Sequence, residues 1–146
     1  MLVIVVLACL LLVPLATLVH YEALRLLSSG LPSLRIASRA RLIAAVLGTF
    51  TAHAVQIALY AAVLWLLVRF AAAGTLGSAS APAFTELLYF SAETYTSLGY
   101  GDLVPTGPLR ALAGVEALNG LLLIGWSASY LYVAMERFWT VEGAPQ

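Results

Sequence analysis

Three long apolar segments divide the chain, and they constrain its fold more than any other feature of the sequence. They run from Leu2 to about Val19, with a helical continuation toward Leu27, from Leu42 to about Val68, and from Leu109 to about Met135. A helix needs about 20 apolar residues to cross the ~30 Å hydrocarbon core of a bilayer. The chain of 146 residues is 62% hydrophobic and 10% charged, whereas soluble domains carry about 25% charged residues. We therefore expect an all-α membrane protein with three transmembrane helices.

The segment between the first two apolar segments, Tyr21–Arg41, is the most basic part of the chain. It holds one acid, Glu22, and four arginines: Arg25, Arg35, Arg39 and Arg41. Cytoplasmic loops carry an excess of basic residues, so we expect this loop in the cytoplasm and the N-terminus outside. The C-terminus is then cytoplasmic, with Glu136 and Arg137 at the inner end of the third helix. A role of these arginines in lipid binding or gating is the alternative to a role in topology.

Composition also limits the class of function. The net charge is zero, which argues against a nucleic-acid partner. Two histidines and the single Cys9, without short spacings, do not predict a metal or haem site, and we expect no cofactor. The sequence has no nucleophile–base set and no phosphate loop, so we do not expect an enzyme. All basic residues are arginine, and alanine and leucine are abundant, which favours a bacterial protein of the inner membrane.

A short helix is predicted between the second and third apolar segments. The stretch 71–82 is small and polar and indicates an exposed loop, and residues 83–95 follow with a helical pattern. Pro82 suits the region of the first turn, and Glu86 lies near the positive end of the helix dipole. These residues are too few to span a bilayer, so we expect a re-entrant helix. Its unpaired backbone ends require surrounding protein, which indicates several subunits around a shared axis.

The next segment carries the most specific motif of the chain, Thr96-Ser97-Leu98-Gly99-Tyr100-Gly101-Asp102. Gly99 and Gly101 can hold left-handed backbone angles on either side of Tyr100, which normally cannot. Such a strand turns successive carbonyl oxygens toward one axis, where they replace the hydration shell of a cation. The motif resembles the selectivity filter of the potassium channel pore family. A glycine-rich turn between two helices is the alternative.

The resemblance implies a homotetramer, in which each subunit donates one carbonyl per layer of the cation cage. K⁺ would then bind at Ser97, Leu98, Gly99 and Tyr100, with the Ser97 hydroxyl closing the innermost site and Thr96 and Gly101 at the two ends. Two residues depart from the usual T-V-G-Y-G pattern, because Ser97 replaces threonine and Leu98 replaces valine. Serine keeps the hydroxyl ligand, so these changes affect fine selectivity rather than cation conduction. K⁺ is the permeant ion and not a cofactor.

Residues around the motif extend the resemblance over about Arg41–Arg137. Tyr89 and Phe90 match the aromatic positions that surround the filter tyrosine, here Tyr100. Glu93 and Asp102 match a carboxyl pair behind the filter, and two close carboxylates share a proton. An ordinary solvated acid is the alternative for Glu93.

The third apolar segment offers candidates for gating. By resemblance, Gly120 matches the hinge glycine of the inner helix, although close helix packing is an equal alternative for Gly120 and for Gly114 and Gly125. Helical spacing from Gly120 places four side chains toward a central cavity, namely Leu121, Ile124, Ala128 and Tyr132. Tyr132 is large enough to form a constriction.

Four polar residues interrupt the apolar segments. His53 and Gln56 share one face of the second segment, and Glu116 and Asn119 share one face of the third. Buried polar groups cost free energy unless they are paired. We therefore expect these four residues to pair across helices within one subunit. The alternative is that each finds backbone, water or the pore separately.

These observations predict an N-terminal helix and basic loop at 1–41, a pore unit at 42–139 and a short tail at 140–146. Within the pore unit we expect an outer helix at 42–68, a pore helix at 83–95, a filter at 96–102 and an inner helix at 109–136. The predicted function is a potassium-selective channel in a lipid bilayer. A weakly selective Na⁺/K⁺ channel and a non-conducting regulatory subunit are the alternatives. No span carries arginine at every third position, so we expect no charge-stepped voltage sensor.

Overall fold

A computed structural model describes residues 1–77 and 82–142 of the chain, with side chains through residue 138. In this part of the chain the elements are helices, namely α1 (Leu2–Gly30), the 3₁₀ turn η1 (Leu31–Ser33), α2 (Ser38–Ala71), α3 (Phe84–Tyr95) and α4 (Leu109–Glu142). Three segments, Leu2–Ser33, Ser38–Ala71 and Leu109–Phe138, are long and apolar enough to cross a membrane. The prediction of an all-helical membrane protein with three transmembrane helices is confirmed.

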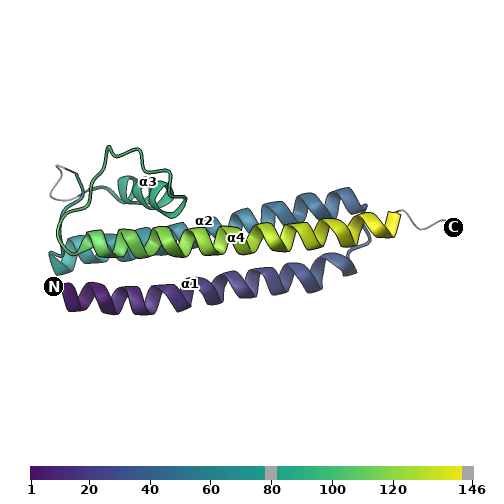
Figure 1. Ribbon diagram of the computed structural model, residues 1–146, viewed down its shortest axis with the longest axis horizontal. Coiled ribbons are helices and arrows are strands. Elements are labelled where there is room, and N and C mark those ends of the chain that lie inside the picture. Colours follow the sequence, from purple (N-terminus) through teal and green to yellow (C-terminus); the bar gives the residue numbers. More distant parts are fainter. Residues whose placement is uncertain (78–81, 143–146) are drawn as a thin grey trace.

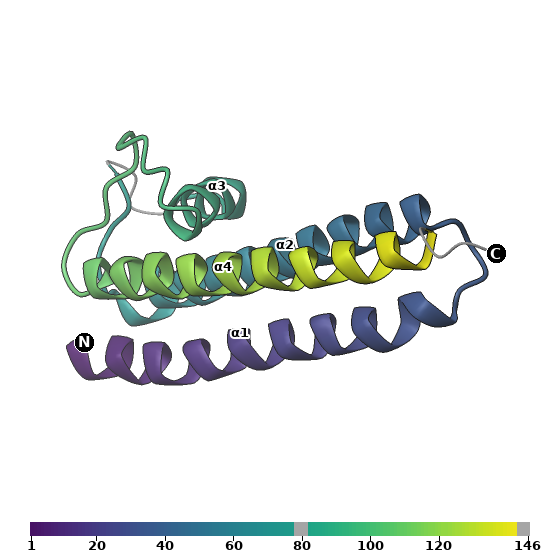
Figure 2. The same ribbon diagram turned by 45° about the vertical axis from the view of Figure 1, so that its right-hand side comes forward.

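The three long helices run side by side, and the short α3 lies at one end of the bundle (Figure 1). Helix α3 packs on α2 and α4, and α1 packs on the same two helices from the opposite side (Figures 1 and 2). The N-terminus lies at the end that carries α3, whereas the α1–α2 connection and the last turns of α4 lie at the other end. Helices α2 and α4 therefore separate α1 from α3.

The helices extend beyond the apolar segments from which they were predicted. Helix α1 continues through the expected basic loop to Gly30, because residues 21–29 contain neither proline nor glycine and Arg25 pairs with Glu22 at 2.7 Å. Helix α2 begins at Ser38, four residues before the expected start of the outer helix. The helical continuation expected toward Leu27 thus reaches Gly30, and residues 31–37 connect the two helices.

The inner and pore helices differ less from prediction. Helix α4 begins at Leu109 as expected and continues to Glu142, past the predicted end at residue 136. Helix α3 begins at Phe84, where the backbone amide of Ala83 donates to the Glu86 carboxylate at 2.8 Å and so caps the first turn. Part of the predicted loop (78–81) and of the tail (143–146) lies outside the described residues.

Two apolar clusters hold the helices together. The larger cluster lies at the α3 end and includes the buried side chains of Leu64, Leu87 and Leu112. The smaller cluster, which includes Ala45, Ala134 and Phe138, lies at the opposite end. There the Arg41 guanidinium sits 5.7 Å from the centre of the Phe138 ring and donates to the Leu34 carbonyl at 2.8 Å. One arginine thus ties the α1–α2 connection to the end of α4.

The segment that follows residues 96–102 is anchored to the segment that follows α2. The Gly77 amide donates to the Val104 carbonyl at 3.1 Å, and the Thr106 amide donates to the Thr75 carbonyl at 3.0 Å. The hydroxyls of Thr75 and Thr106 lie 2.9 Å apart. These contacts fix both ends of the chain that carries α3 and the filter.

Candidate functional site

The backbone of residues 97–101 alternates between positive and negative φ. Ser97, Gly99 and Gly101 have φ of 58°, 56° and 80°, whereas Leu98 and Tyr100 have negative φ. In an ordinary strand successive carbonyl groups point to opposite sides. When the sign of φ alternates from residue to residue, successive carbonyl groups can point to the same side. A left-handed angle costs a residue with a Cβ atom about 1–2 kcal/mol, so Ser97 holds a strained conformation that its surroundings must support.

Helix α3 supplies that support. The amide of Ser97 donates to the Thr94 carbonyl at 2.9 Å, and the amide of Leu98 donates to the Glu93 carbonyl at 2.8 Å. The Thr96 hydroxyl donates to the Ala92 carbonyl at 2.8 Å, so it closes the last turn of α3. The negative end of the α3 dipole therefore lies where the predicted filter begins.

Aromatic residues meet the filter from one side. The Tyr89 and Tyr100 rings stack with 6.5 Å between centroids and 2° between planes. Desolvation, then the hydrogen bond and negative charge of Asp102, and then Glu93, raise the pKa of the Tyr89 hydroxyl to about 12. Phe90 is placed differently from the expectation, because it is buried in the larger apolar cluster rather than against Tyr100.

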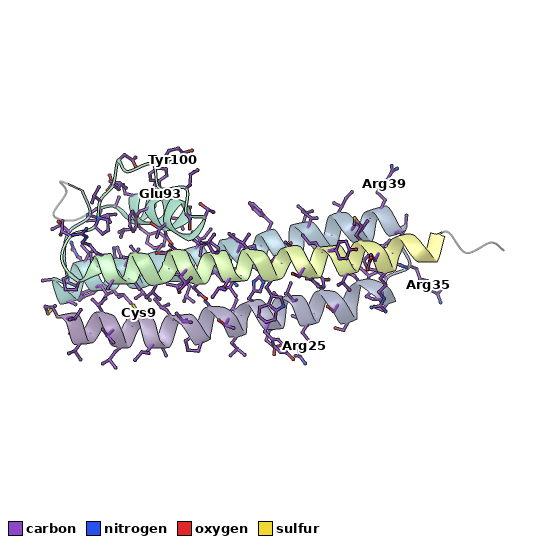
Figure 3. All side chains as sticks on the ribbon, viewed as in Figure 1. Cys9, Arg25, Arg35, Arg39, Glu93 and Tyr100 are labelled. Carbon is purple, nitrogen blue, oxygen red and sulfur yellow. The ribbon has the colours of Figure 1, made fainter. Side chains whose placement is uncertain are left out.

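The two predicted carboxyl groups have different environments. Glu93 is 4% exposed, and its Oε2 atom has no hydrogen-bond partner, so it is not a solvated helix acid. Asp102 is exposed and accepts from the Leu103 amide at 3.0 Å. Among the described residues no direct hydrogen bond joins Glu93 to Asp102. Figure 3 shows Glu93 and Tyr100 together at the α3 end of the molecule.

Gly120 lies where α4 crosses the end of α3. A Cβ atom at Gly120 would lie 2.0 Å from the Tyr95 carbonyl oxygen, whereas a Cβ at Gly114 or Gly125 would meet no atom within 4 Å. Close packing therefore accounts for Gly120, and its role as a hinge stays a prediction. Tyr132, the predicted constriction, is exposed on α4 and donates to the Glu136 carboxylate at 2.8 Å.

The four polar residues of the spans are hydrogen-bonded within the subunit, but not to one another as expected. His53 and Gln56 contact Tyr95. The Ser91 hydroxyl donates to Glu116, and the Asn119 amide donates to the Tyr60 hydroxyl at 3.0 Å. The predicted direct pairing is wrong because each of the four residues bonds another polar side chain, either on α3, as with Tyr95 and Ser91, or at a different position of α2, as with Tyr60.

Sequence reasoning missed several of these partners. His20 on α1 and Ser127 on α4 are buried and complete the polar contacts of His53 and Gln56. The signal for His20 was present, because a histidine in an apolar span needs a partner as much as His53 does. No comparable signal marked Ser127 or Tyr95, since a serine in a helix often bonds its own backbone and a tyrosine is common in an apolar core.

The filter residues lie on the surface of the single chain. All residues from Thr96 to Asp102 are exposed, with Leu98 at 59% and Tyr100 at 67%. Their unpaired backbone groups could not face lipid.

Comparisons with known proteins agree with this arrangement. Residues 50–137, which contain α3, the filter and most of α4, match the family described as ion channel. Over 75 residues the chain is 36% identical to the inward rectifier potassium channel Kirbac3.1 of Paramagnetospirillum magnetotacticum, a match that covers 51% of this chain and 25% of that protein. The chain therefore matches about a quarter of the relative's length. No solved structure matches. Helix α1 lies outside the family match.

Proposed function

Because this chain belongs to the ion channel family, we propose that it conducts K⁺ selectively across a bacterial membrane through residues 97–101. Membership of this family and three membrane-spanning helices make it a multi-pass membrane channel rather than an enzyme. The K⁺ selectivity is the part that we propose.

The alternating backbone of residues 97–101 is the observation that carries the proposal. Left-handed angles at Ser97, Gly99 and Gly101 allow the carbonyls of Ser97, Leu98, Gly99 and Tyr100 to serve as successive layers of cation ligands. Carbonyl oxygens in such layers replace the hydration shell of K⁺. The Ser97 hydroxyl would close the innermost layer. The relative Kirbac3.1 is itself named a potassium channel, which supports K⁺ as the ion.

One chain supplies only part of such a cage, and its filter is exposed on one side. We therefore propose four identical subunits around one axis, with the filters facing each other. Large apolar side chains on the outer surface, including Phe50 at 71% exposure, would contact lipid or neighbouring subunits.

The orientation follows from the arginines. Five arginines lie on the part of the bundle away from the filter, as Figure 3 shows for Arg35 and Arg39. These five are Arg25, Arg35, Arg39, Arg41 and Arg137. Only Arg69 and Arg110 flank the filter end. Since basic residues concentrate on the cytoplasmic side, we propose that the filter and the N-terminus face outward and that α4 ends in the cytoplasm.

Ion flux into liposomes that contain only the purified chain tests this function. We expect K⁺ flux that exceeds Na⁺ flux, and we expect Tyr100→Ala to lose that preference because the ring behind the filter is removed. Tyr21→Ala is the control, since Tyr21 is a partly exposed tyrosine on α1. Equal K⁺ and Na⁺ flux would favour a weakly selective channel. No flux without a partner would favour a regulatory subunit.

A further inference from the structure

Five buried or half-buried side chains from all four helices form a closed ring of hydrogen bonds. His53 Nδ1 lies 2.9 Å from Tyr95 Oη, and His53 Nε2 lies 2.9 Å from Ser127 Oγ. Ser127 Oγ lies 3.2 Å from His20 Nε2, and His20 Nδ1 lies 3.0 Å from Gln56 Nε2. The Tyr95 hydroxyl closes the ring by donating to Gln56 Oε1. The ring joins α1 to the last residue of the pore helix.

The Gln56 amide sets the direction of every bond in this ring. Its nitrogen can only donate, so His20 Nδ1 must accept and the His20 proton resides on Nε2. His20 Nε2 then donates to Ser127, which leaves the Ser127 hydroxyl proton for His53 Nε2. His53 therefore carries its proton on Nδ1 and donates to Tyr95, whose own proton goes to Gln56.

All ring atoms are satisfied when both histidines are neutral and in opposite tautomers. The second amide proton of Gln56 is also used, because Nε2 lies 3.3 Å from the Ala16 carbonyl of α1. A proton added to His20 would place an N–H against the Gln56 NH₂ group. A proton added to His53 would meet the hydroxyl proton of Ser127, which can turn away and let the Ser127 oxygen accept from both histidines. Protonation of His20 therefore breaks the ring at Gln56, whereas protonation of His53 leaves it connected.

The surroundings of the histidines offer no substitute partner. The two imidazole rings lie 5.0 Å apart, so two positive charges would repel each other. Trp126 of α4 packs on His20 at 5.5 Å between ring centroids. In the described part of the chain, the buried carboxyl groups of Glu93 on α3 and Glu116 on α4 form no hydrogen bond to the ring, and the same holds for the Tyr60 hydroxyl of α2.

Tyr95 connects the ring to the filter. It is the last residue of α3 and precedes Thr96 directly. Its carbonyl oxygen fits against Gly120 of α4 without room for a Cβ atom, so a displaced Tyr95 would displace the filter entrance or α4. Its hydroxyl is held only through Gln56 and His53, and Gln56 is held in turn by His20.

We propose that His20, His53, Gln56 and Ser127 are positioning residues of the filter, which they hold through Tyr95, and that protonation of His20 releases this hold. Helix α1, which lies outside the family match, is thereby a regulatory element of the channel. Only the flux measurement below depends on the proposed function as a K⁺ channel. The hydrogen-bonded ring and its coupling to residues 96–101 can be measured by NMR in a chain that carries no ions.

Solid-state NMR on the full chain in lipid tests the ring directly, because the chain has only two histidines. At neutral pH we expect two neutral imidazoles, His20 protonated on Nε2 and His53 on Nδ1. On acidification, the amide signals of residues 96–101 should shift with the same midpoint as the His20 nitrogens. The same tautomer on both histidines, or filter amides that do not follow His20, would overturn the proposal.

Two variants separate positioning from simple structural support. Tyr95→Phe removes the ring hydroxyl, and Tyr60→Phe is the control, since Tyr60 is a fully buried tyrosine whose hydroxyl bonds Asn119 outside the ring. We expect Tyr95→Phe to change the K⁺/Na⁺ flux ratio about eightfold, the factor for the two interhelical hydrogen bonds that the hydroxyl makes, and to remove its pH dependence. Equal effects of the two variants, with wild-type pH dependence, would contradict the role of Tyr95.

Gln56→Glu gives a second test that keeps the ring connected, although the carboxylate gives up the bond to the Ala16 carbonyl. A carboxylate accepts from both the protonated Nδ1 of His20 and the Tyr95 hydroxyl, so His20 should now gain its proton without moving the amides of residues 96–101. If these amides still shift together with His20 in this variant, the proposed coupling is wrong. A wild-type chain that shows the tautomers and the coupled shifts but carries no K⁺ would refute the proposed function alone.

Discussion

Gly120 of α4 packs closely against the backbone of Tyr95 at the end of α3. The distance of 2.0 Å between a Cβ at Gly120 and the Tyr95 carbonyl oxygen is far below any real contact, and a backbone oxygen cannot rotate away as a flexible side chain can. Gly125 lies on the same helix with open space around it. The two glycines therefore form a natural pair for substitution.

We expect Gly120→Ala to lower the thermal stability of the purified channel and to reduce flux. Alanine gains about 1 kcal/mol of helix propensity, but overpacking costs about 1–3 kcal/mol and moves the start of the filter. Gly125→Ala is the control and should leave stability unchanged or raised. Melting in detergent and liposome flux measure both effects. Equal melting temperatures for the two variants would show that α4 and α3 are not packed as described.

Helix α3 places Tyr89 and Glu93 beside the filter, where they can interact with Asp102 at its outer end. The Tyr89 hydroxyl is protonated at physiological pH, as an ordinary tyrosine is, so it can act as a donor toward these carboxyl groups. Because Glu93 has a buried oxygen without a hydrogen-bond partner and both carboxyl groups influence the Tyr89 hydroxyl, we expect Tyr89 to couple Glu93 to Asp102.

Double-mutant cycles should detect this link. We expect Glu93→Gln and Asp102→Asn to affect K⁺ conduction non-additively, with a coupling of about 0.5–3 kcal/mol. Repeating the cycle in Tyr89→Phe should reduce the coupling, because the phenol hydroxyl connects the two carboxyl groups. Additive effects with Tyr89 intact would mean that Glu93 and Asp102 act independently.

The whole molecule exposes at one end a filter that cannot face lipid alone. We therefore expect the purified, flux-active species to have a protein mass of four times the 15.5 kDa chain. Native mass spectrometry, or light scattering corrected for detergent, measures it. A flux-active dimer without any larger form would contradict the tetramer, because each chain carries one filter motif.

The orientation of the chain in the membrane can be tested by cysteine labelling. In a Cys9→Ala background, a cysteine placed at Leu2 should react with an impermeant thiol reagent from outside the cell. A cysteine placed at Arg35 should react only after the membrane is opened, because the α1–α2 connection lies at the opposite end of the bundle from the N-terminus. Labelling of residue 2 only from the cytoplasmic side would reverse the proposed orientation.

Much of this protein could be predicted from local sequence patterns. The lengths of the apolar segments determine three spanning helices, since a helix of fixed rise must match the bilayer thickness. The glycines of residues 96–102 mark the positions where a left-handed backbone costs little conformational free energy, and the structure has positive φ at Gly99 and Gly101. Both properties depend on residues close together in the chain.

Contacts between helices could not be predicted in this way. A three-residue spacing places His53 and Gln56 on one face of α2, but it does not determine which helix covers that face or at what depth. Only the packing of α1, α3 and α4 around α2 decided that their partners are His20, Tyr95 and Ser127 rather than Glu116 and Asn119. The same packing decided that Gly120 faces a carbonyl oxygen. Relative rotation and depth of helices come from side-chain fit between distant segments, which no local pattern records.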